Sequence, residues 1–446
     1  MKETTTSKPE VHDTSITETP PESNVVIIEA EVKETTPQDA ALIQNSKKQF
    51  YKYAAINFAF FITMTFGGYV NVFLQSIGFN PQQVGRIAAI NSGVGIFSSP
   101  FWGMLSDKLR SLKKIIIITL AIGGGLFALI PLMSRFNIAG VSILFLLIPL
   151  TMFFRMPVMS LIDNWMLRNS RKENLNYGAL RAYGALSFAI MAFALGSFIV
   201  PRTGPALIFY IGMIFTIPPL LIIIFVKGGA DDQGLDKKRL TFKEMQIGQL
   251  FKNYYLVTYI IFTVIQRIPF HSAMIFLPFL IYDVGGNIEQ LGIIMGIKAV
   301  VEIPLMMLLK KLRQKYPLYT LIIVATGFFV VESILLSFAT NFSMVIVICV
   351  LHGIGNGLMI PSGSSYMFQL APENLKATAQ TVLASMTAIA GIIGASLGGA
   401  IIMRMGVHQF YFIVGIMLAV ALGLFVLSFI IGEKALRIKR PGLSLN

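Results

Sequence analysis

The chain has 446 residues, of which 55% are hydrophobic and only 13% are charged. Soluble globular domains carry about 25% charged residues, so this composition excludes a soluble globular protein and indicates an integral membrane protein. The net charge of +14 would favour a nucleic-acid partner in a soluble chain. In a membrane protein we expect this charge to lie in the loops that set orientation, and we predict no nucleic-acid binding.

The N-terminal stretch, residues 1–46, is polar and holds three lysines and nine acids, which is a net charge of −6. It is rich in Thr, Glu and Pro and poor in aromatic residues, so it cannot bury enough apolar surface to order itself. We therefore predict a disordered tail, and we predict no cleavable signal. The single cysteine, Cys349, excludes a disulfide framework.

Apolar runs of about 20 residues, the length that spans a bilayer, follow one another along the rest of the chain. The first six are residues 50–76, 83–106, 114–133, 138–163, 177–200 and 204–226. After a polar stretch, the second six are residues 254–282, 288–310, 317–340, 343–369, 377–404 and 408–432. We therefore predict an all-α membrane protein with twelve transmembrane helices in two pseudo-symmetric six-helix bundles. The predicted parts after the tail are a bundle over 47–226, a central loop over 227–252, a bundle over 253–432 and a basic C-terminal segment over 433–446.

Lysine and arginine residues lie almost entirely on one side of the predicted bundles. The side that carries the N-terminal tail holds 25 of them, whereas the opposite loops hold three, Arg135, Arg202 and Arg404. Positively charged loops remain in the cytoplasm. We therefore predict a multi-pass protein of the inner or plasma membrane, with both termini and the central loop in the cytoplasm.

The loop after the second run reads GMLSDKLRSLKK from Gly103 to Lys114. It resembles the loop motif G-x-L-[SA]-D-[KR]-x-G-R-[KR] of the major facilitator transporters, in which Gly103, Asp107 and Lys108 would form a conformational motif. Arg110 stands where that family has its second glycine. The resemblance implies two parallel halves built from inverted three-helix repeats, with the solute bound between the halves near the membrane midplane.

The fourth and fifth runs carry an acid and a base, Asp163 and Arg181, within apolar sequence. Charges inside a membrane are costly and are usually retained for function, although a salt bridge that only locks two helices is the alternative. The region resembles helices 4 and 5 of the lactose permease and sucrose permease group, whose pattern F-G-x-x-R-x-[FY]-G is matched from Tyr177 to Gly184. The resemblance implies that Asp163 and Arg181 bind sugar hydroxyls and that Phe188 stacks on a sugar ring.

Three titratable residues lie inside apolar runs of the second half: Glu302, Glu332 and His352. Acids and histidines in such positions are the usual proton relays of transporters, so all three are candidate proton-coupling residues. His352 matches the helix 10 histidine of the lactose permease group, which implies a contact with substrate. The proton-carrying glutamate of that group is replaced by Gly355. The alternatives are that Glu302 satisfies backbone groups freed by Pro304, and that His352 is a neutral packed histidine.

Four further residues are candidate cavity-lining groups because they carry charge or titrate within or near the spans. They are Arg155, Arg267, His271 and Lys298. Lys298 precedes Glu302 by one helical turn, so neutralisation of that acid on the same helix face is an alternative role for the lysine.

Together these features predict a secondary active transporter that imports a small polar solute, a sugar or oligosaccharide, by proton symport with alternating access. The sequence holds no P-loop, metal-ligand cluster or nucleophile triad, so we predict no enzymatic activity, no cofactor and no metal. The expected partners are the solute, protons and the lipid bilayer, and the expected state is a monomer. The alternatives are an importer of nucleosides or of aromatic or organic acids, an uncoupled facilitator suggested by Gly355, and a non-transporting membrane sensor suggested by the acidic tail.

Overall fold

The computed structural model describes residues 37–138, 140–173, 175, 177–226, 250, 252–287, 290–372 and 375–442. By its internal contacts the chain divides into two units, Met1–Asn45 and Ser46–Asn446, and each is described by itself. Of the first unit, the structure describes the helical residues that begin at Pro37. The rest of the predicted tail and most of the predicted central loop lie outside the described residues.

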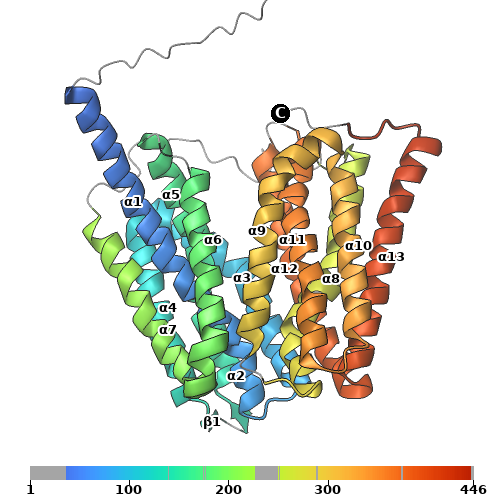
Figure 1. The fold of residues 1–446 in the computed structure, drawn as a ribbon, viewed down its shortest axis with the longest axis horizontal. Coiled ribbons are helices and arrows are strands. Elements are labelled where there is room, and N and C mark those ends of the chain that lie inside the picture. The colour runs from blue at the N-terminus through green and yellow to red at the C-terminus, as the bar shows by residue number, and fades with distance from the viewer. Residues whose placement is uncertain are drawn as a thin grey trace, which may run out of the picture. The chain divides into compact units, whose positions relative to one another are not determined.

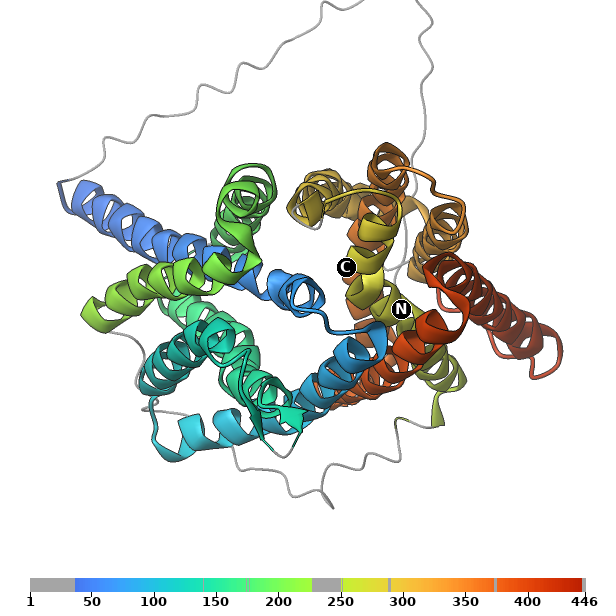
Figure 2. The same ribbon diagram turned by 90° about the horizontal axis from the view of Figure 1, so that it is seen from below.

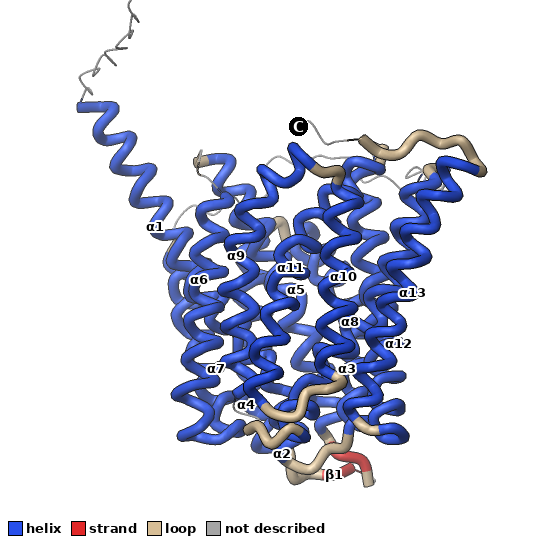
Figure 3. Tube along the Cα trace, turned by 45° about the vertical axis from the view of Figure 1, so that its right-hand side comes forward, coloured by secondary structure: helices blue, strands red, loops and turns tan. Residues whose placement is uncertain are grey.

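Almost all of the described chain is helical (Figure 3). The N-terminal half contains α1 (Pro37–Thr65), the 3₁₀ turn η1 (Phe66–Tyr69), α2 (Val70–Ser76), α3 (Pro81–Lys108), α4 (Leu112–Leu132), α5 (Leu144–Lys172), α6 (Tyr177–Ala194), the π-helical turn η2 (Leu195–Ile199) and α7 (Val200–Phe225). A short antiparallel hairpin, β1 (Asn137–Ile138) and β2 (Val141–Ser142), precedes α5. The C-terminal half contains α8 (Tyr254–Asp283), α9 (Leu291–Lys315), α10 (Leu318–Leu336), α11 (Phe342–Leu370), α12 (Lys376–Met405) and α13 (Val407–Lys434).

Helices dominate because a bilayer offers no hydrogen bonds to an unpaired backbone, so each spanning segment must satisfy its own polar groups. Asparagine side chains start two of these helices. The Asn253 side chain accepts hydrogen bonds from the N–H groups of Tyr255 and Leu256 at the start of α8. The Asn341 side chain accepts one from the Met344 N–H at the start of α11. Such caps pair the first amides of a helix, which otherwise have no partner.

Ten described helical runs are long and apolar enough to cross a membrane. One of them, Ala179–Phe225, has 47 residues and is interrupted at Gly204, where φ is 73° and ψ is 167°, so it holds two of the predicted spans. The helix α3 is not among the ten, and it carries buried or partly buried polar residues such as Asn91 and Ser98. The other predicted spans agree closely with the helices, and the all-α membrane fold is confirmed.

The fourth predicted span, residues 138–163, has wrong boundaries, because α5 begins at Leu144 and ends at Lys172. The start moves because the chain first turns through the hairpin, at Gly140 with a φ of 79°. The end moves because the residues after Asp163 continue the helix. Asp163 therefore lies inside α5 rather than at the end of the span.

Two clusters of buried apolar side chains form the core of the second unit. One belongs to the N-terminal half alone and contains Tyr53 and Trp165. The other contains Phe73 and Leu195 of the N-terminal half together with Leu291 of the C-terminal half. The two halves therefore share one apolar core, and η2 packs on α9 and α2 on α8.

Two seams join the halves, α3 with α12 and α6 with α9 (Figures 1 and 2). Glycines allow backbone contact at both seams. A Cβ added to Gly85 of α3 would lie 2.4 Å from the carbonyl oxygen of Ala395 in α12. A Cβ added to Gly196 of η2 would lie 2.6 Å from the Cα of Gly292 in α9. These close contacts lie near the starts of α3 and α9, so the halves are packed together on the membrane side that carries the hairpin, the side seen in Figure 2.

Candidate functional site

An ion pair joins α5 and α6 in the N-terminal half. Arg181 Nη1 lies 3.0 Å from Asp163 Oδ1, and the two side chains are 33% and 30% exposed. The guanidinium carbon of Arg181 lies 4.4 Å from the ring centre of Phe61 in α1. Phe61 packs this closely because Gly184 has no side chain, and a Cβ there would lie 2.5 Å from the Phe61 ring. The pair is thus held in a fixed place while remaining accessible.

Such a pair can recognise a polar solute. An ionised carboxylate accepts hydrogen bonds from hydroxyl groups, and a guanidinium donates several in a fixed plane. Phe188, two helical turns after Arg181, is partly buried and packs against the core cluster of the N-terminal half. Its expected stacking on a sugar ring remains a prediction.

Arg155 of α5 points into the N-terminal bundle. Its side chain is buried, and Nη2 donates a hydrogen bond of 3.0 Å to the carbonyl oxygen of Thr63. Its guanidinium carbon lies 4.2 Å from the ring centre of Phe127. Thr63 lies in the last turn of α1, where carbonyl groups lack partners within the helix. These contacts join α5 to α1 and α4 in this conformation, and the predicted cavity-lining role of Arg155 remains a prediction.

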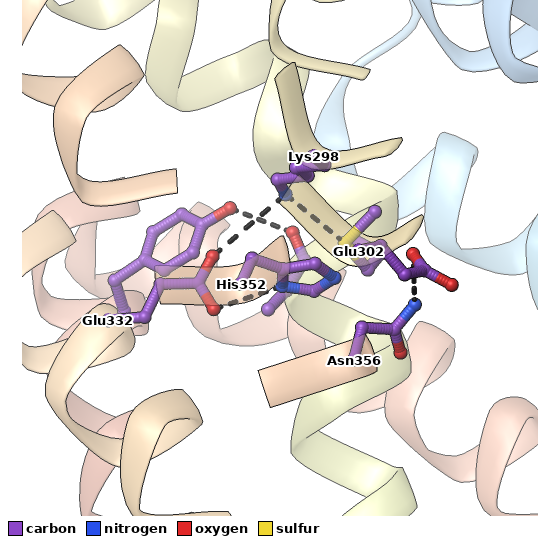
Figure 4. A network of polar contacts seen from close by, with 8 residues as sticks. Lys298, Glu302, Glu332, His352 and Asn356 are labelled. Carbon is purple, nitrogen blue, oxygen red and sulfur yellow. Dashed lines mark hydrogen bonds and ion pairs between the residues drawn. The ribbon is translucent and has the colours of Figure 1, made fainter. Parts of the chain in front are cut away.

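A buried cluster of three titratable side chains lies inside the C-terminal half (Figure 4). Nδ1 of His352 in α11 lies 3.0 Å from Oε2 of Glu332 in α10. Nζ of Lys298 in α9 lies 3.9 Å from the other carboxylate oxygen, Oε1. Lys298 also donates to the sulfur of Met274 in α8 at 3.6 Å. Side chains from α8, α9, α10 and α11 therefore meet in this cluster.

Aromatic rings and a hydroxyl group enclose this cluster. The imidazole of His352 stacks on Phe270, with 5.4 Å between ring centres, and lies 5.4 Å from the ring centre of Phe329. The hydroxyl of Tyr411 donates to the carbonyl oxygen of Ala273 at 2.7 Å. The cavity between these groups has a volume of about 10 Å³. That is room for about one water molecule, so no sugar can reach the cluster in this conformation.

A second polar pair joins α9 and α11 beside the cluster. Asn356 Nδ2 donates a hydrogen bond of 2.9 Å to Glu302 Oε2, and both residues are partly buried (Figure 4). Lys298, which was expected to neutralise Glu302 on its own helix, forms an ion pair with Glu332 of α10. Glu302 and Asn356 together present one carboxylate and one amide, which are groups that recognise hydroxyls.

Arg267 and His271 lie one helical turn apart on α8. Arg267 lines a cavity of about 110 Å³ together with side chains of α8, α11 and α12. Its guanidinium carbon lies 5.0 Å from the ring centre of Phe270. Nε2 of His271 is buried and has no hydrogen-bond partner within the described part of the chain. Arg267 lies at this cavity, and the cavity-lining roles of Arg267 and His271 in transport remain predictions.

The predicted conformational motif lies at the end of α3. A Cβ added to Gly103 would meet no atom within 4 Å, so this conformation does not use the glycine for a close approach. Lys108 is exposed, and the side chain of Asp107 lies outside the described residues. Arg110, which replaces the second glycine of the motif, has a φ of 49°. The backbone thus keeps the left-handed conformation that glycine adopts without strain.

Sequence reasoning did not identify Asn356, Phe61 or Phe270. A signal for Asn356 was present, since it lies one helical turn after His352 within an apolar run. Nothing local marks Phe61 or Phe270, because aromatic residues are common in every span. Within the described ranges, no group of three or more His, Cys, Asp or Glu side chains could hold a metal ion.

Comparison with known proteins places most of the chain beside membrane transporters. A family model described as the MFS_1 like family matches residues 50–414. The uncharacterized transporter YwbF of Bacillus subtilis (strain 168) is 25% identical over 353 residues, which are 77% of this chain and 84% of that protein. The maltose permease of Geobacillus stearothermophilus is 23% identical over 363 residues, which are 79% of this chain and 88% of that protein.

The crystal structure of the nucleoside transporter NupG is similar in fold, with a TM-score of 0.71 at 16% sequence identity. The similarity covers 85% of this chain and 98% of that one. At this identity the comparison shows a shared fold alone.

Proposed function

Since the chain belongs to the MFS_1 like family of membrane transporters, we propose that it imports a small polar solute, a sugar or oligosaccharide, by proton symport. The observation that carries the proposal is the contrast between two kinds of polar site. The Glu332, His352 and Lys298 side chains are sealed beside room for about one water, whereas Asp163 and Arg181 are about one-third exposed. A proton can reach the first site, and a solute can reach the second.

The solute is held between the halves. Asp163 and Arg181 supply a carboxylate and a guanidinium from the N-terminal half, and Glu302 and Asn356 supply a carboxylate and an amide from the C-terminal half. Both sets match the donors and acceptors of sugar hydroxyls. The relative named maltose permease supports this class of solute.

The proton is carried by the Glu332 and His352 pair. With Lys298 charged and His352 neutral, the cluster has no net charge, so an added proton leaves an excess positive charge in a buried place. Such a charge is costly, and a conformation that relieves it is favoured. We assign the proton to the pair rather than to either residue alone, because two groups in contact titrate together.

The helix α9 links the proton to the solute and to the seam between the halves. It carries Gly292 at the seam with η2, Lys298 in the buried cluster and Glu302 beside Asn356. A change in the charge around Lys298 therefore acts on the same helix that contacts the solute and closes one side. This shared helix gives the two states different affinities for the proton, which is what symport requires.

The direction of transport follows from the loop charges. The positively charged loops support a cytoplasmic location of both termini, with the packed seams on the opposite side. In this orientation the described conformation is closed to the outside, and solute and proton leave to the cytoplasm.

The proposal is tested with purified protein in proteoliposomes. Labelled maltose, then a panel of sugars, nucleosides and organic anions, is offered with and without an inside-alkaline proton gradient. We expect one sugar to accumulate only with the gradient and to carry protons inward when added alone. Accumulation that ignores the gradient, or transport of no sugar in the panel, would overturn the proposal.

An organic anion is the second candidate solute, favoured by one observation. Arg267 lines the cavity of about 110 Å³, and an anion is the natural partner of a guanidinium that faces such a space. The same panel separates the two candidates, because an anion importer would accumulate carboxylates and ignore neutral sugars.

A further inference from the structure

Gln266 of α8 is a polar side chain buried inside the C-terminal half. It is fully buried, and neither its amide nitrogen nor its amide oxygen has a hydrogen-bond partner among the described residues. Buried amides are almost always paired with protein or with ordered water, so this side chain requires a partner. The surroundings of Gln266 indicate which one.

Gln266 lies on the stretch of α8 that lines the larger cavity, about one helical turn before the first residue that lines the smaller one. Phe270 and Ala273, four and seven residues after it, line the one-water cavity of the proton cluster. Tyr259 and Thr263, seven and three residues before it, and Arg267, directly after it, line the cavity of about 110 Å³. Residues seven apart share one face of a helix, so Gln266 projects from the same face as the walls of both cavities. The nearest of these wall residues, Arg267 and Phe270, are about 4.5 Å apart along the helix axis, at about 1.5 Å per residue.

A second buried polar group packs against the wall of the larger cavity. The ring centre of Tyr366 in α11 is 5.1 Å from that of Tyr259, and the buried Tyr366 hydroxyl has no partner in the described chain. Gly363, one turn before Tyr366, lines the same cavity, and a Cβ there would lie 2.6 Å from the Tyr259 hydroxyl oxygen. The glycine thus leaves room for a hydroxyl at the cavity wall.

We propose that Gln266 holds ordered water between these two cavities and so forms a proton route inside the C-terminal bundle, separate from the path of the solute. The amide donates a hydrogen bond to one water and accepts one from another, and protons pass along the waters. The amide itself gains and loses no proton. The route leads from the Glu332 cluster toward Tyr259 and Tyr366, near the membrane side at which α8 begins and α11 ends. This inference rests on the proposed proton symport.

Two substitutions test the route. Gln266→Met keeps the length of the side chain and removes both polar ends, and Tyr366→Phe removes only the hydroxyl. Ser272→Ala is the matched control, because Ser272 is a buried, unpartnered residue of α8 that faces Gly398 of α12 instead of the cavities.

The first readout is transport in proteoliposomes with maltose as the probe. Exchange at equal solute concentrations needs no net proton release, so we expect it to stay within about twofold of the unmodified protein. We expect proton movement on maltose addition to fall at least about tenfold in Gln266→Met, and less in Tyr366→Phe, while Ser272→Ala is unchanged. Proton movement in Gln266→Met within twofold of the unmodified protein would overturn the route.

The second readout is thermal unfolding, which needs no solute. If water pairs the Gln266 amide, removing the amide gives no gain in melting temperature. A rise of several degrees in Gln266→Met would show a dry, unpaired amide and overturn the inference. The absence of maltose-driven proton movement in the unmodified protein counts instead against the proposed symport of this sugar, and the unfolding experiment then decides the inference alone.

Discussion

Glu332 of α10 and His352 of α11 face each other across 3.0 Å, and their side chains are only 6% and 8% exposed. Lys298 completes the cluster at 3.9 Å from the carboxylate. We predict that Glu332→Gln abolishes gradient-driven accumulation and preserves exchange of solute, because the amide keeps the shape of the carboxylate but takes up no proton. Accumulation and exchange are measured on the same vesicles, and concentrative uptake by the variant would exclude Glu332 as a member of the proton site.

We also predict that the ion pair between Lys298 and Glu332 contributes to the stability of the fold. Lys298→Met leaves the Glu332 carboxylate buried without its cation, and breaking a buried pair costs about 3–5 kcal/mol. Lys298→Met combined with Glu332→Gln removes both charges, so we expect it to recover most of the lost stability. Thermal unfolding of the two single variants and the double variant measures the coupling. Additive losses would mean that the two residues do not interact.

We predict that a change in the Asp163 and Arg181 pair weakens solute binding and leaves the fold intact. Arg181→Lys keeps the charge but loses the planar group that lies over Phe61, so we expect solute affinity to fall at least about tenfold. Melting temperature should change little, because each side chain is about one-third exposed and such pairs contribute at most about 1 kcal/mol.

The control for this prediction is Arg202→Lys, which changes an exposed arginine of the same half at the start of α7. Normal solute affinity in Arg181→Lys would mean that the pair only joins α5 to α6 and does not bind the solute.

Much of the fold could be predicted because bilayer thickness sets the length of an apolar run. The error at α5 arose where two other signals mattered, the hairpin before Leu144 and the helical residues after Asp163. The residues before Leu144 are mostly apolar although they form the hairpin, and many residues after Asp163 are polar although they are helical, so a pattern based on apolar length could find neither boundary.

The site could be predicted only in part. Glu332 and His352 were visible as polar residues in apolar runs, but their contact joins positions 20 apart in sequence on different helices. The helical spacing rule connected Lys298 to Glu302, whereas the long lysine side chain reaches Glu332 on the next helix. Asn356 meets Glu302 across a separation of 54 residues, and no spacing rule relates such positions.

We predict a small gain in stability when Arg110 is replaced by glycine. Its φ of 49° is left-handed, a conformation that costs roughly 1–2 kcal/mol for a residue with a Cβ. We expect Arg110→Gly to raise the melting temperature or leave it unchanged, since the relief of strain exceeds the added freedom of the unfolded chain. Lys108→Gly, placed in the last turn of α3, is the control and should lower it. A clear loss of stability in Arg110→Gly would show that the arginine side chain contributes contacts that outweigh the strain.

The last prediction concerns the seam between α6 and α9. A Cβ on Gly292 would lie 2.2 Å from the Tyr69 hydroxyl oxygen and 2.5 Å from the carbonyl oxygen of Ala192, so Gly292→Ala cannot keep the seam closed. Overpacking of this kind costs about 1–3 kcal/mol, which shifts a two-state equilibrium by about 5- to 150-fold. We expect spin-label distances across the hairpin side to lengthen in Gly292→Ala. Gly327→Ala is the control, because a Cβ there meets no atom within 4 Å. Unchanged distances in Gly292→Ala would mean that the seam adjusts without opening, and that Gly292 does not hold this side closed.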